Sequence, residues 1–323
     1  MPLPSDEKLI ALSQALLQQM EALFGEHPGF RPAHAKGLML SGTFTPSPEA
    51  RTLTRAPHMT RESTPVWARF SNSTGLPLLP DNNPNANPRG LAIRFHLAEH
   101  VHTDIISHAT DGFPTRTGDE FLEFLRAVVA SNEATSSPSP IEAFLATHPA
   151  ALAFVQTPKP TPSSFAKEQY FGVTAFRFVA EDGASRYGRY RIVPEAGAEY
   201  LDGDALKNWD RSFLFEELRT RVAAGPVGFR IQVQVANDND VVDDATVHWP
   251  EDRPLVDLGS LVLTELVPDN EAQQKKTIFD PIPRVDGIEP SNDPLLELRA
   301  AIYLISGRKR RQASDAKPAT AAG

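Results

Sequence analysis

Residues 293–311 read DPLLELRAAIYLISGRKRR, and this pattern predicts the helix around which the chain is organised. Asp293 can cap the helix, and Pro294 suits its first turn. Arg299 and Tyr303 are four residues apart and therefore share one face. A guanidinium one turn from a phenol can stabilise the phenolate, and a phenolate is a hard anionic ligand for ferric iron. The alternative interpretation is a C-terminal helix with a buried tyrosine and a solvated basic end.

Charge and composition exclude several classes of protein. The chain has 323 residues, a formal net charge of −9 and no cysteine. A net negative charge argues against a nucleic-acid partner, because no basic surface dominates. The lack of cysteine excludes disulfides, cysteine-ligated zinc, iron–sulfur clusters and a thiolate-ligated haem.

The N-terminal region gives no sign of export or membrane insertion. No apolar run approaches the roughly 20 residues that a membrane-spanning helix needs. The first residues, MPLPSDEK, carry acids where a signal peptide would be basic, and no apolar core follows them. We therefore expect a cytoplasmic protein without a membrane span.

Hydrophobic periodicity predicts strands with interspersed helices. Strands are expected over 38–45, 65–71, 91–96, 104–113, 170–179, 187–194, 227–236 and 258–266. Helices are expected over 5–24, 118–130, 141–155 with a break at Pro149, 210–223 and 293–311. Because strands and helices do not alternate, the pattern favours an α+β fold, an antiparallel sheet or barrel with attached helices.

Among the nine histidines, His34 is the first candidate for chemistry. It lies in the irregular segment 26–37, three residues after Arg31, and loops hold reactive groups more often than helix faces do. A histidine can shuttle a proton near neutral pH. The alternative is a loop histidine with ordinary hydrogen bonds. His96, His100 and His102 also cluster, but their spacing matches no standard zinc site.

Six segments read together resemble the haem catalases. They are HAKG at 34–37, VWARFS at 66–71, NPRG at 87–90, TIFDP at 277–281, GIEPS at 287–291 and RAAIY at 299–303. The family has a distal His-Ala-Lys-Gly, a Val-Arg-Phe-Ser strand, Asp-Pro-Arg-Gly, and Arg-x-x-x-Tyr on the helix that carries the iron ligand. Order and spacing agree from about residue 28 to 311, so the resemblance covers nearly the whole chain.

The resemblance implies a fold and a cofactor. Members of this family hold haem b, Fe(III) protoporphyrin IX, within an antiparallel β-barrel of about eight strands and surrounding helices. This chain is shorter than a full catalase and is expected to lack its C-terminal domain, so it is similar to the small catalase-related peroxidases, or minicatalases. The implied organisation is an N-terminal helix over 1–25, a catalase-like haem-binding domain over 26–311 and a disordered tail over 312–323.

Matching motif positions also imply roles for individual residues. Tyr303 would be the axial ligand to ferric iron, and Arg299 would hold it as phenolate. His34 would be the distal catalytic histidine, and Ser71 would fix its imidazole by a hydrogen bond. The remaining implied contacts are Arg31, Arg69 and Arg310 with the haem propionates, and Phe113 and Phe121 on or beside the haem. Arg308 matches the family's Arg-x-Arg together with Arg310, so both are expected to face inward.

One position departs from the family pattern. The distal asparagine of catalases lies in Gly-Asn-Asn-Thr-Pro, where this chain has SHATD at 107–111. His108 therefore falls at the position of the asparagine that holds hydrogen peroxide for the second, reducing step. This change argues against rapid disproportionation of hydrogen peroxide but leaves peroxide cleavage possible.

The resulting prediction is a haem peroxidase of organic hydroperoxides and hydrogen peroxide. Its partners would be the peroxide and a small-molecule electron donor, with weak catalase activity and a monomeric or homodimeric state. One alternative is a fatty-acid hydroperoxide isomerase of the same fold. The other is a non-catalytic β-barrel that binds haem or an apolar ligand.

Overall fold

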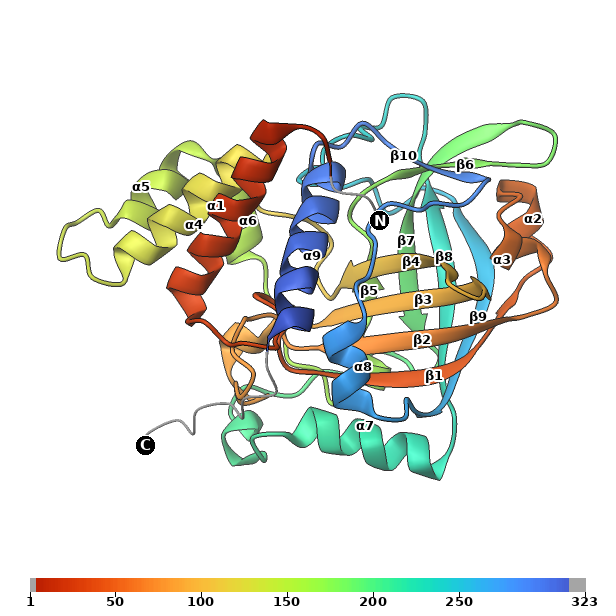
Figure 1. Cartoon of the computed structure of the whole chain (residues 1–323), viewed down its shortest axis with the longest axis horizontal. Coiled ribbons are helices and arrows are strands. Elements are labelled where there is room, and N and C mark those ends of the chain that lie inside the picture. Colours follow the sequence, from red (N-terminus) through yellow and green to blue (C-terminus); the bar gives the residue numbers. More distant parts are fainter. Residues whose placement is uncertain (1–3, 314–323) are drawn as a thin grey trace.

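The centre of the molecule is a closed antiparallel barrel, seen in a computed structural model that describes residues 4–313 (Figure 1). Eight strands pair in the order β1-β2-β3-β4-β5-β7-β8-β9, and β9 pairs again with β1. The barrel strands are β1 Gly37–Pro46, β2 Thr64–Ser71, β3 Gly90–Ala98, β4 Val101–His108, β5 Tyr170–Phe171, β7 Ser185–Pro194, β8 Val227–Val235 and β9 Leu255–Leu266. The predicted α+β barrel of about eight strands is confirmed.

Alternation along the strands divides the barrel into two faces. In β2, Ala68 and Phe70 are completely buried in the barrel interior, where they join the main apolar cluster. Arg69 and Ser71 point the opposite way, toward the helices outside the barrel. The interior is packed with aromatic and branched side chains, so functional groups have to lie on the outer face or at the strand ends.

Helices cover one outer side of the barrel and one end (Figure 1). The larger helices are α1 Glu7–Phe24, α4 Gly118–Ser131, α5 Pro140–Thr147, α6 Pro149–Gln156, α7 Phe213–Ala224 and α9 Leu295–Gln312. A second apolar cluster joins α1, α4 and α9 through residues such as Leu16, Leu125 and Leu298. Helix α9 therefore stands between this helical layer and the barrel wall.

Several elements differ from the sequence-based expectation. The strand predicted over 170–179 is split into β5 and β6, Phe176–Val179, because residues 172–175 leave the strand and Thr174 accepts a hydrogen bond from Arg299. The elements that periodicity missed are α2 Ala50–Leu53, α3 Pro57–Thr60, α8 Asn270–Lys276, β10 Ile288–Pro290 and three 3₁₀ turns. All are short, so they offer too few residues for a period to be recognised.

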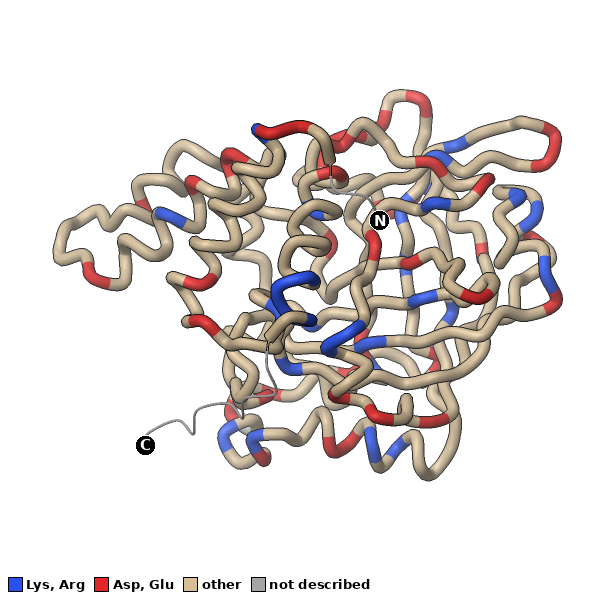
Figure 2. The backbone as a smooth tube through the Cα atoms, viewed as in Figure 1, with Lys and Arg blue, Asp and Glu red and all other residues tan. Residues whose placement is uncertain are grey.

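The predicted disordered tail, 312–323, lies outside the described residues except for its first two positions. Within residues 4–313, no helix has the length and apolar composition needed to cross a membrane. Lys and Arg gather at the C-terminal end of α9 and on the adjacent α8, while acidic residues are spread over the rest of the surface (Figure 2).

Truncating Phe70 tests the packing of the barrel interior. Phe70→Ala should lower the free energy of unfolding by about 3–5 kcal/mol, because the ring packs on Phe165, Tyr170 and Phe229 and leaves a cavity when removed. The control Leu78→Ala, at a side chain that is 63% exposed, should stay within about 0.5 kcal/mol. Urea unfolding followed by circular dichroism measures both, and equal losses would contradict an ordered interior.

Candidate active site

A cavity of about 210 Å³ lies between the outer wall of the barrel and helix α9. Strands β2, β3 and β4 form one wall, the segment 31–34 forms a second, and α9 forms a third. The residues that line it include Arg31, His34, Arg69, Ser71, His108, Phe113, Arg299, Tyr303 and Arg310. The structure thus brings together all but one of the site residues predicted from the sequence. The exception is Phe121, which does not line the cavity. Its ring packs on that of Phe113, which does, with 5.1 Å between the ring centroids.

His34 is held in the cavity wall by a strained backbone and a close fit. Its φ angle is 56°, in the left-handed region, and its backbone N–H donates to Ser73 O at 2.8 Å. The imidazole Nδ1 lies 3.1 Å from Ser71 Oγ. Gly90 lies directly beside this pair, because a Cβ there would be 2.6 Å from Ser71 Oγ and 2.8 Å from Nδ1. The predicted hydrogen bond between Ser71 and the His34 imidazole is present.

The environment of His34 keeps its imidazole neutral. Burial lowers its pKa from 6.5 to about 4, and the positive charges of Arg69, Arg31 and Arg299 act in the same direction. A hydrogen bond with the backbone of Asn72 opposes them. In the tautomer with the proton on Nδ1, the neutral imidazole donates to Ser71 Oγ, and its Nε2 is free to accept a proton in the cavity.

Helix α9 presents Arg299 and Tyr303 to the opposite side of the cavity. The Asp293 carboxylate accepts a hydrogen bond from Leu295 N at 2.9 Å, so it caps the helix as its sequence suggested. The guanidinium carbon of Arg299 lies 5.9 Å from the centre of the Tyr303 ring, and Arg299 Nη1 donates to Thr174 Oγ1 at 3.1 Å. The phenol therefore faces the cavity beside a fixed positive charge.

Three further arginines gather at this cavity. Their guanidinium groups donate mainly to backbone carbonyls, Arg31 and Arg310 both to Thr277 O and Arg69 to His34 O. Burial lowers the pKa of Arg69 to about 9 and that of Arg310 to about 10, and each of these two pKa values is lowered further by a neighbouring arginine. Burial and the charges of Arg69 and Arg310 also lower the pKa of Arg31 well below its usual range.

Within residues 4–313, none of Arg31, Arg69, Arg299 and Arg310 has a carboxylate partner. By contrast, the buried Arg94 on β3 is paired with Asp104 through two contacts of 2.7 and 2.8 Å. Buried positive charges without anions are costly, so the cavity suits a ligand that brings its own negative charges. A flat apolar group with two carboxylates and a metal that binds phenolate meets this requirement, and haem is such a group.

Gly37 leaves space for the guanidinium group of Arg69, one of the arginines that line the cavity. A Cβ at Gly37 would lie 2.2 Å from Arg69 Nη2, so only glycine leaves room for this side chain. Gln274 Oε1 accepts a hydrogen bond from Arg69 Nε at 2.9 Å. Sequence reasoning missed Gly37, Thr174 and Gln274 as supporting residues, because a contact between distant segments leaves no local pattern.

His108 also lines the cavity, at the end of β4 and in register with Gly90. Burial lowers its pKa to about 3, with smaller contributions from His34, Arg299 and Lys159. Its Nδ1 is buried without a partner in the described part of the chain. An unpaired buried N–H costs more than an unpaired lone pair, which favours the tautomer with the proton on Nε2. His108 is therefore a neutral hydrogen-bond donor.

Two expectations at the edges of the site can be compared with the structure. Arg308 is exposed and does not face inward. Successive residues of an α-helix point in directions about 100° apart, so Arg308 points away from the side of α9 that buries Gly307. Arg310 is buried, as predicted.

His96 and His102 face each other across β3 and β4, yet no group of three potential metal ligands occurs in the described residues.

Comparisons with known proteins show which family the chain belongs to. The family described as Catalase matches residues 8–316. A catalase-related peroxidase of Mycolicibacterium paratuberculosis is 35% identical over 289 residues, 88% of this chain and 90% of that protein. A catalase-related peroxidase of Synechococcus elongatus is 34% identical over 300 residues, 91% of this chain and 87% of that protein.

Full-length catalases match over a smaller share of their own length. The peroxisomal catalase of Toxoplasma gondii is 28% identical over 298 residues, 87% of this chain but 59% of that protein. The crystal structure of a fungal catalase superposes with a TM-score of 0.78 at 22% identity, covering 91% of this chain and 62% of that one. This structural likeness shows the fold alone.

Filling the space beside His34 should disturb the cavity wall. Gly90→Ala should lower the free energy of unfolding by about 1–3 kcal/mol, because the new Cβ overlaps Ser71 Oγ and the imidazole. Gly203→Ala is the control, since nothing lies within 4 Å of a Cβ there, and its effect should be within about 1 kcal/mol. Urea unfolding compares the two; an unchanged stability for Gly90→Ala would contradict the close fit.

Proposed function

The chain belongs to the catalase family and is an oxidoreductase that acts on peroxide, and from this premise we propose that it is a haem-dependent peroxidase. It would reduce organic hydroperoxides and hydrogen peroxide with an external small-molecule electron donor, with only weak catalase activity. The observation that carries the proposal is one cavity with a neutral His34 on one side, Arg299 and Tyr303 on the other, and three more unpaired arginines.

Residues on the α9 side of the cavity and the arginines around it would hold the cofactor. Tyr303 would bind the iron as phenolate beside Arg299, and Arg31, Arg69 and Arg310 would hold the propionates. Phe113 would pack on the haem with Phe121 behind it. We place this haem-binding region at 26–311, preceded by the N-terminal helix over 1–25. When bound, ferric haem supplies the redox centre at which the O–O bond of a peroxide is cleaved.

The opposite wall supplies acid–base chemistry. A neutral His34 accepts the proton of a hydroperoxide through the nitrogen that Ser71 leaves free, and then delivers this proton to the departing oxygen. Ser71 keeps the ring in one orientation while the proton moves. The Nε2–H of His108 donates to the peroxide, in place of the amide that other members carry there. Two one-electron transfers from the donor, together with two protons, complete the conversion of ROOH to ROH and water.

Replacing His34 tests the proton transfer. His34→Asn should lower the rate of peroxide cleavage by about 10²–10⁴-fold while haem content is kept, because asparagine tolerates the left-handed backbone but cannot accept the proton. His100→Asn is the matched control, since His100 has a φ of 60° and lies on the surface. Stopped-flow mixing with cumene hydroperoxide measures both. Unaltered cleavage in His34→Asn would refute the assignment.

Replacing Tyr303 tests the iron ligand. Tyr303→Phe should shift the ferric haem absorption spectrum or abolish haem binding, because the phenolate oxygen is lost. The control is Tyr187→Phe on β7, which should leave the spectrum of the ferric protein unchanged. An unchanged spectrum in Tyr303→Phe would remove the ligand assignment.

The pH dependence follows from the pKa of His34. Its folded-state pKa of about 4 lies below the ordinary 6.5, so the base is neutral from pH 7 down to about pH 4. Peroxide cleavage should therefore fall in acid with a midpoint near pH 4. The unfolded chain takes up this proton at higher pH, so the stability linked to His34 is lost as the pH falls from 6.5 to 4. A midpoint at 6.5 would contradict the buried, neutral state.

A donor-free incubation separates this function from the two alternatives. With a fatty-acid hydroperoxide and no donor, a peroxidase should stop after a single turnover, and adding a dye donor should restore turnover. Sustained formation of rearranged lipid products without donor would indicate an isomerase. A protein that binds haem but leaves every hydroperoxide intact would indicate a binding barrel.

A further inference from the structure

A second cluster of buried polar residues lies behind the wall that holds His34. His34, Ser71 and Gly90 meet in that wall, although they come from three different segments of the chain. A polar residue that belongs to the second cluster lies next to each of them in the sequence. Lys36 follows His34 by two positions, Asn72 directly follows Ser71, and Arg89 directly precedes Gly90. All three cluster residues converge on Asp81, which the loop between β2 and β3 contributes. We call these four residues the Asp81 cluster.

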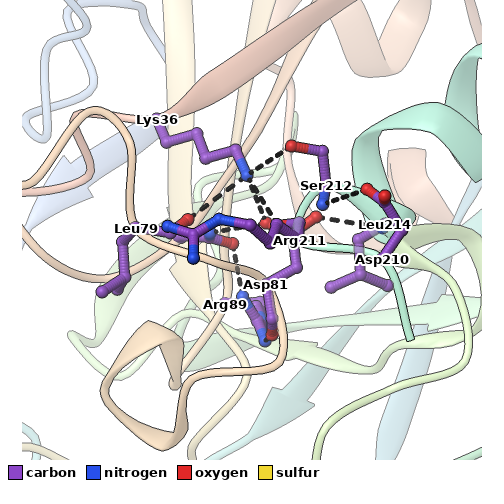
Figure 3. Close-up of polar contacts among 9 residues, drawn as sticks. Lys36, Leu79, Asp81, Arg89, Asp210, Arg211, Ser212 and Leu214 are labelled. Atoms are coloured by element: carbon purple, nitrogen blue, oxygen red, sulfur yellow. Dashed lines mark hydrogen bonds and ion pairs between the residues drawn. The ribbon is translucent and has the colours of Figure 1, made fainter. Parts of the chain in front are cut away.

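The contacts of the Asp81 cluster are short and direct. Figure 3 shows Lys36, Asp81 and Arg89 together with the start of α7. Asp81 Oδ1 accepts from Lys36 Nζ at 2.7 Å and from Asn72 Nδ2 at 2.9 Å. Arg89 donates through one guanidinium nitrogen to Asn72 Oδ1 and through the other to Asp81 O, the latter at 2.6 Å. Every member therefore contacts at least one other.

Burial makes this arrangement rigid. Asp81 and Arg89 are completely buried, and Asn72 is 1% exposed. Asp81 Oδ2 accepts from Leu214 N at 3.0 Å, which ties the cluster to the first turn of α7. The buried carboxylate of Asp81 is thus paired with Lys36, while Arg89 is held by the backbone carbonyl of Asp81 and by Asn72, so removing a partner leaves a buried charge without compensation. The positions of Lys36, Asn72 and Arg89 are consequently fixed relative to one another.

The cluster is linked to His34 through the backbone as well. Asn72 N donates to Lys36 O at 3.1 Å, His34 N to Ser73 O at 2.8 Å and Ala35 N to Thr74 O at 2.9 Å. These bonds join 34–36 to 72–74 beyond the point where β1 and β2 stop pairing. His34 also has a left-handed backbone, which persists only where its surroundings determine it. The Asp81 cluster adjoins these surroundings through Lys36 and Asn72, which are joined by one of the backbone bonds above.

We infer that Lys36, Asn72, Asp81 and Arg89 are positioning residues that fix the imidazole of His34 for proton transfer. The inference rests on the proposed function, since it assigns His34 its role. It also explains the Asn-Pro-Arg-Gly segment: Arg89 anchors the cluster, and Gly90 leaves room for the imidazole. The cluster lies on the His34 side of the cavity and contacts neither Arg299 nor Tyr303. Its loss should therefore disturb the proton acceptor and spare the iron ligand.

Asp81→Asn tests this inference, because it removes the carboxylate charge that pairs with Lys36 at nearly constant volume. The control is Asp240→Asn, which removes a carboxylate from Arg253, with contacts of 2.7 and 3.0 Å, away from the cavity. The haem-loaded proteins are titrated with cyanide, which binds ferric haem as the anion after HCN has given up its proton, so its affinity reports a correctly placed base. Hydrogen exchange of peptides covering 31–37 and 71–75 gives a readout that does not depend on haem.

For Asp81→Asn we expect a cyanide dissociation constant raised at least tenfold, peroxide cleavage slowed by about 10–100-fold and faster exchange in both peptides. The ferric spectrum should be unchanged. Asp240→Asn should leave the cyanide affinity and the cleavage rate within twofold of the wild type. An Asp81→Asn protein with lowered thermal stability but wild-type cyanide affinity would show a merely structural role and overturn the inference.

A second variant and the wild-type response separate failure of the inference from failure of the proposed function. If Asp81→Asn does not fold, Arg89→Lys takes its place, because it keeps the charge but cannot bridge Asn72 and Asp81; wild-type cyanide affinity in Arg89→Lys overturns the inference. If the wild-type protein holds no haem or shows no cyanide response, the proposed function fails. If the wild type responds and Asp81→Asn responds equally, only the role of the Asp81 cluster fails.

Discussion

Four guanidinium groups surround one cavity without a carboxylate among residues 4–313 to balance them, and the rest of the site depends on this excess of positive charge. Burial lowers the pKa of His34 most, and the charges of Arg69, Arg31 and Arg299 lower it further. Arg299 also places a cation beside the Tyr303 ring. An isolated protein core would not retain such a cluster, because unpaired buried charge is destabilising. The charge imbalance is the observation that best supports the proposed anionic ligand.

The barrel makes this arrangement possible because its interior face is apolar and its outer face carries the polar residues of the site. The interior face is filled with apolar side chains and supplies stability. The outer face of β2, β3 and β4 carries Arg69, Ser71 and His108, all held at strand positions that cannot shift without breaking register. Helix α9 approaches this face from the other side of the cavity and is fixed by its packing on α1 and α4. In the proposed function, proton transfer and metal binding would therefore come from separate structural layers.

Much of this could be predicted from the sequence. The period-2 pattern of β2 separated Ala68 and Phe70 from Arg69 and Ser71, and helical spacing put Arg299 next to Tyr303. Motifs in a fixed order then suggested that His34 lies opposite Tyr303. Contacts between distant segments could not be predicted. The salt bridge of Lys36 with Asp81 and the space that Gly90 leaves for His34 join residues more than 40 positions apart, and no local pattern records them. The inward direction assigned to Arg308 was wrong, since a basic cluster does not show which of its members is buried.

The central claim is that the unpaired arginines and Tyr303 form a haem site with a phenolate ligand. Resonance Raman spectroscopy of the purified ferric protein tests it most directly, with excitation in the phenolate-to-iron charge-transfer band. The account predicts one haem per chain and phenolate ring modes that shift when the protein is grown with ring-deuterated tyrosine. A protein that takes up no haem, or a haem protein whose spectrum lacks these modes, would contradict it.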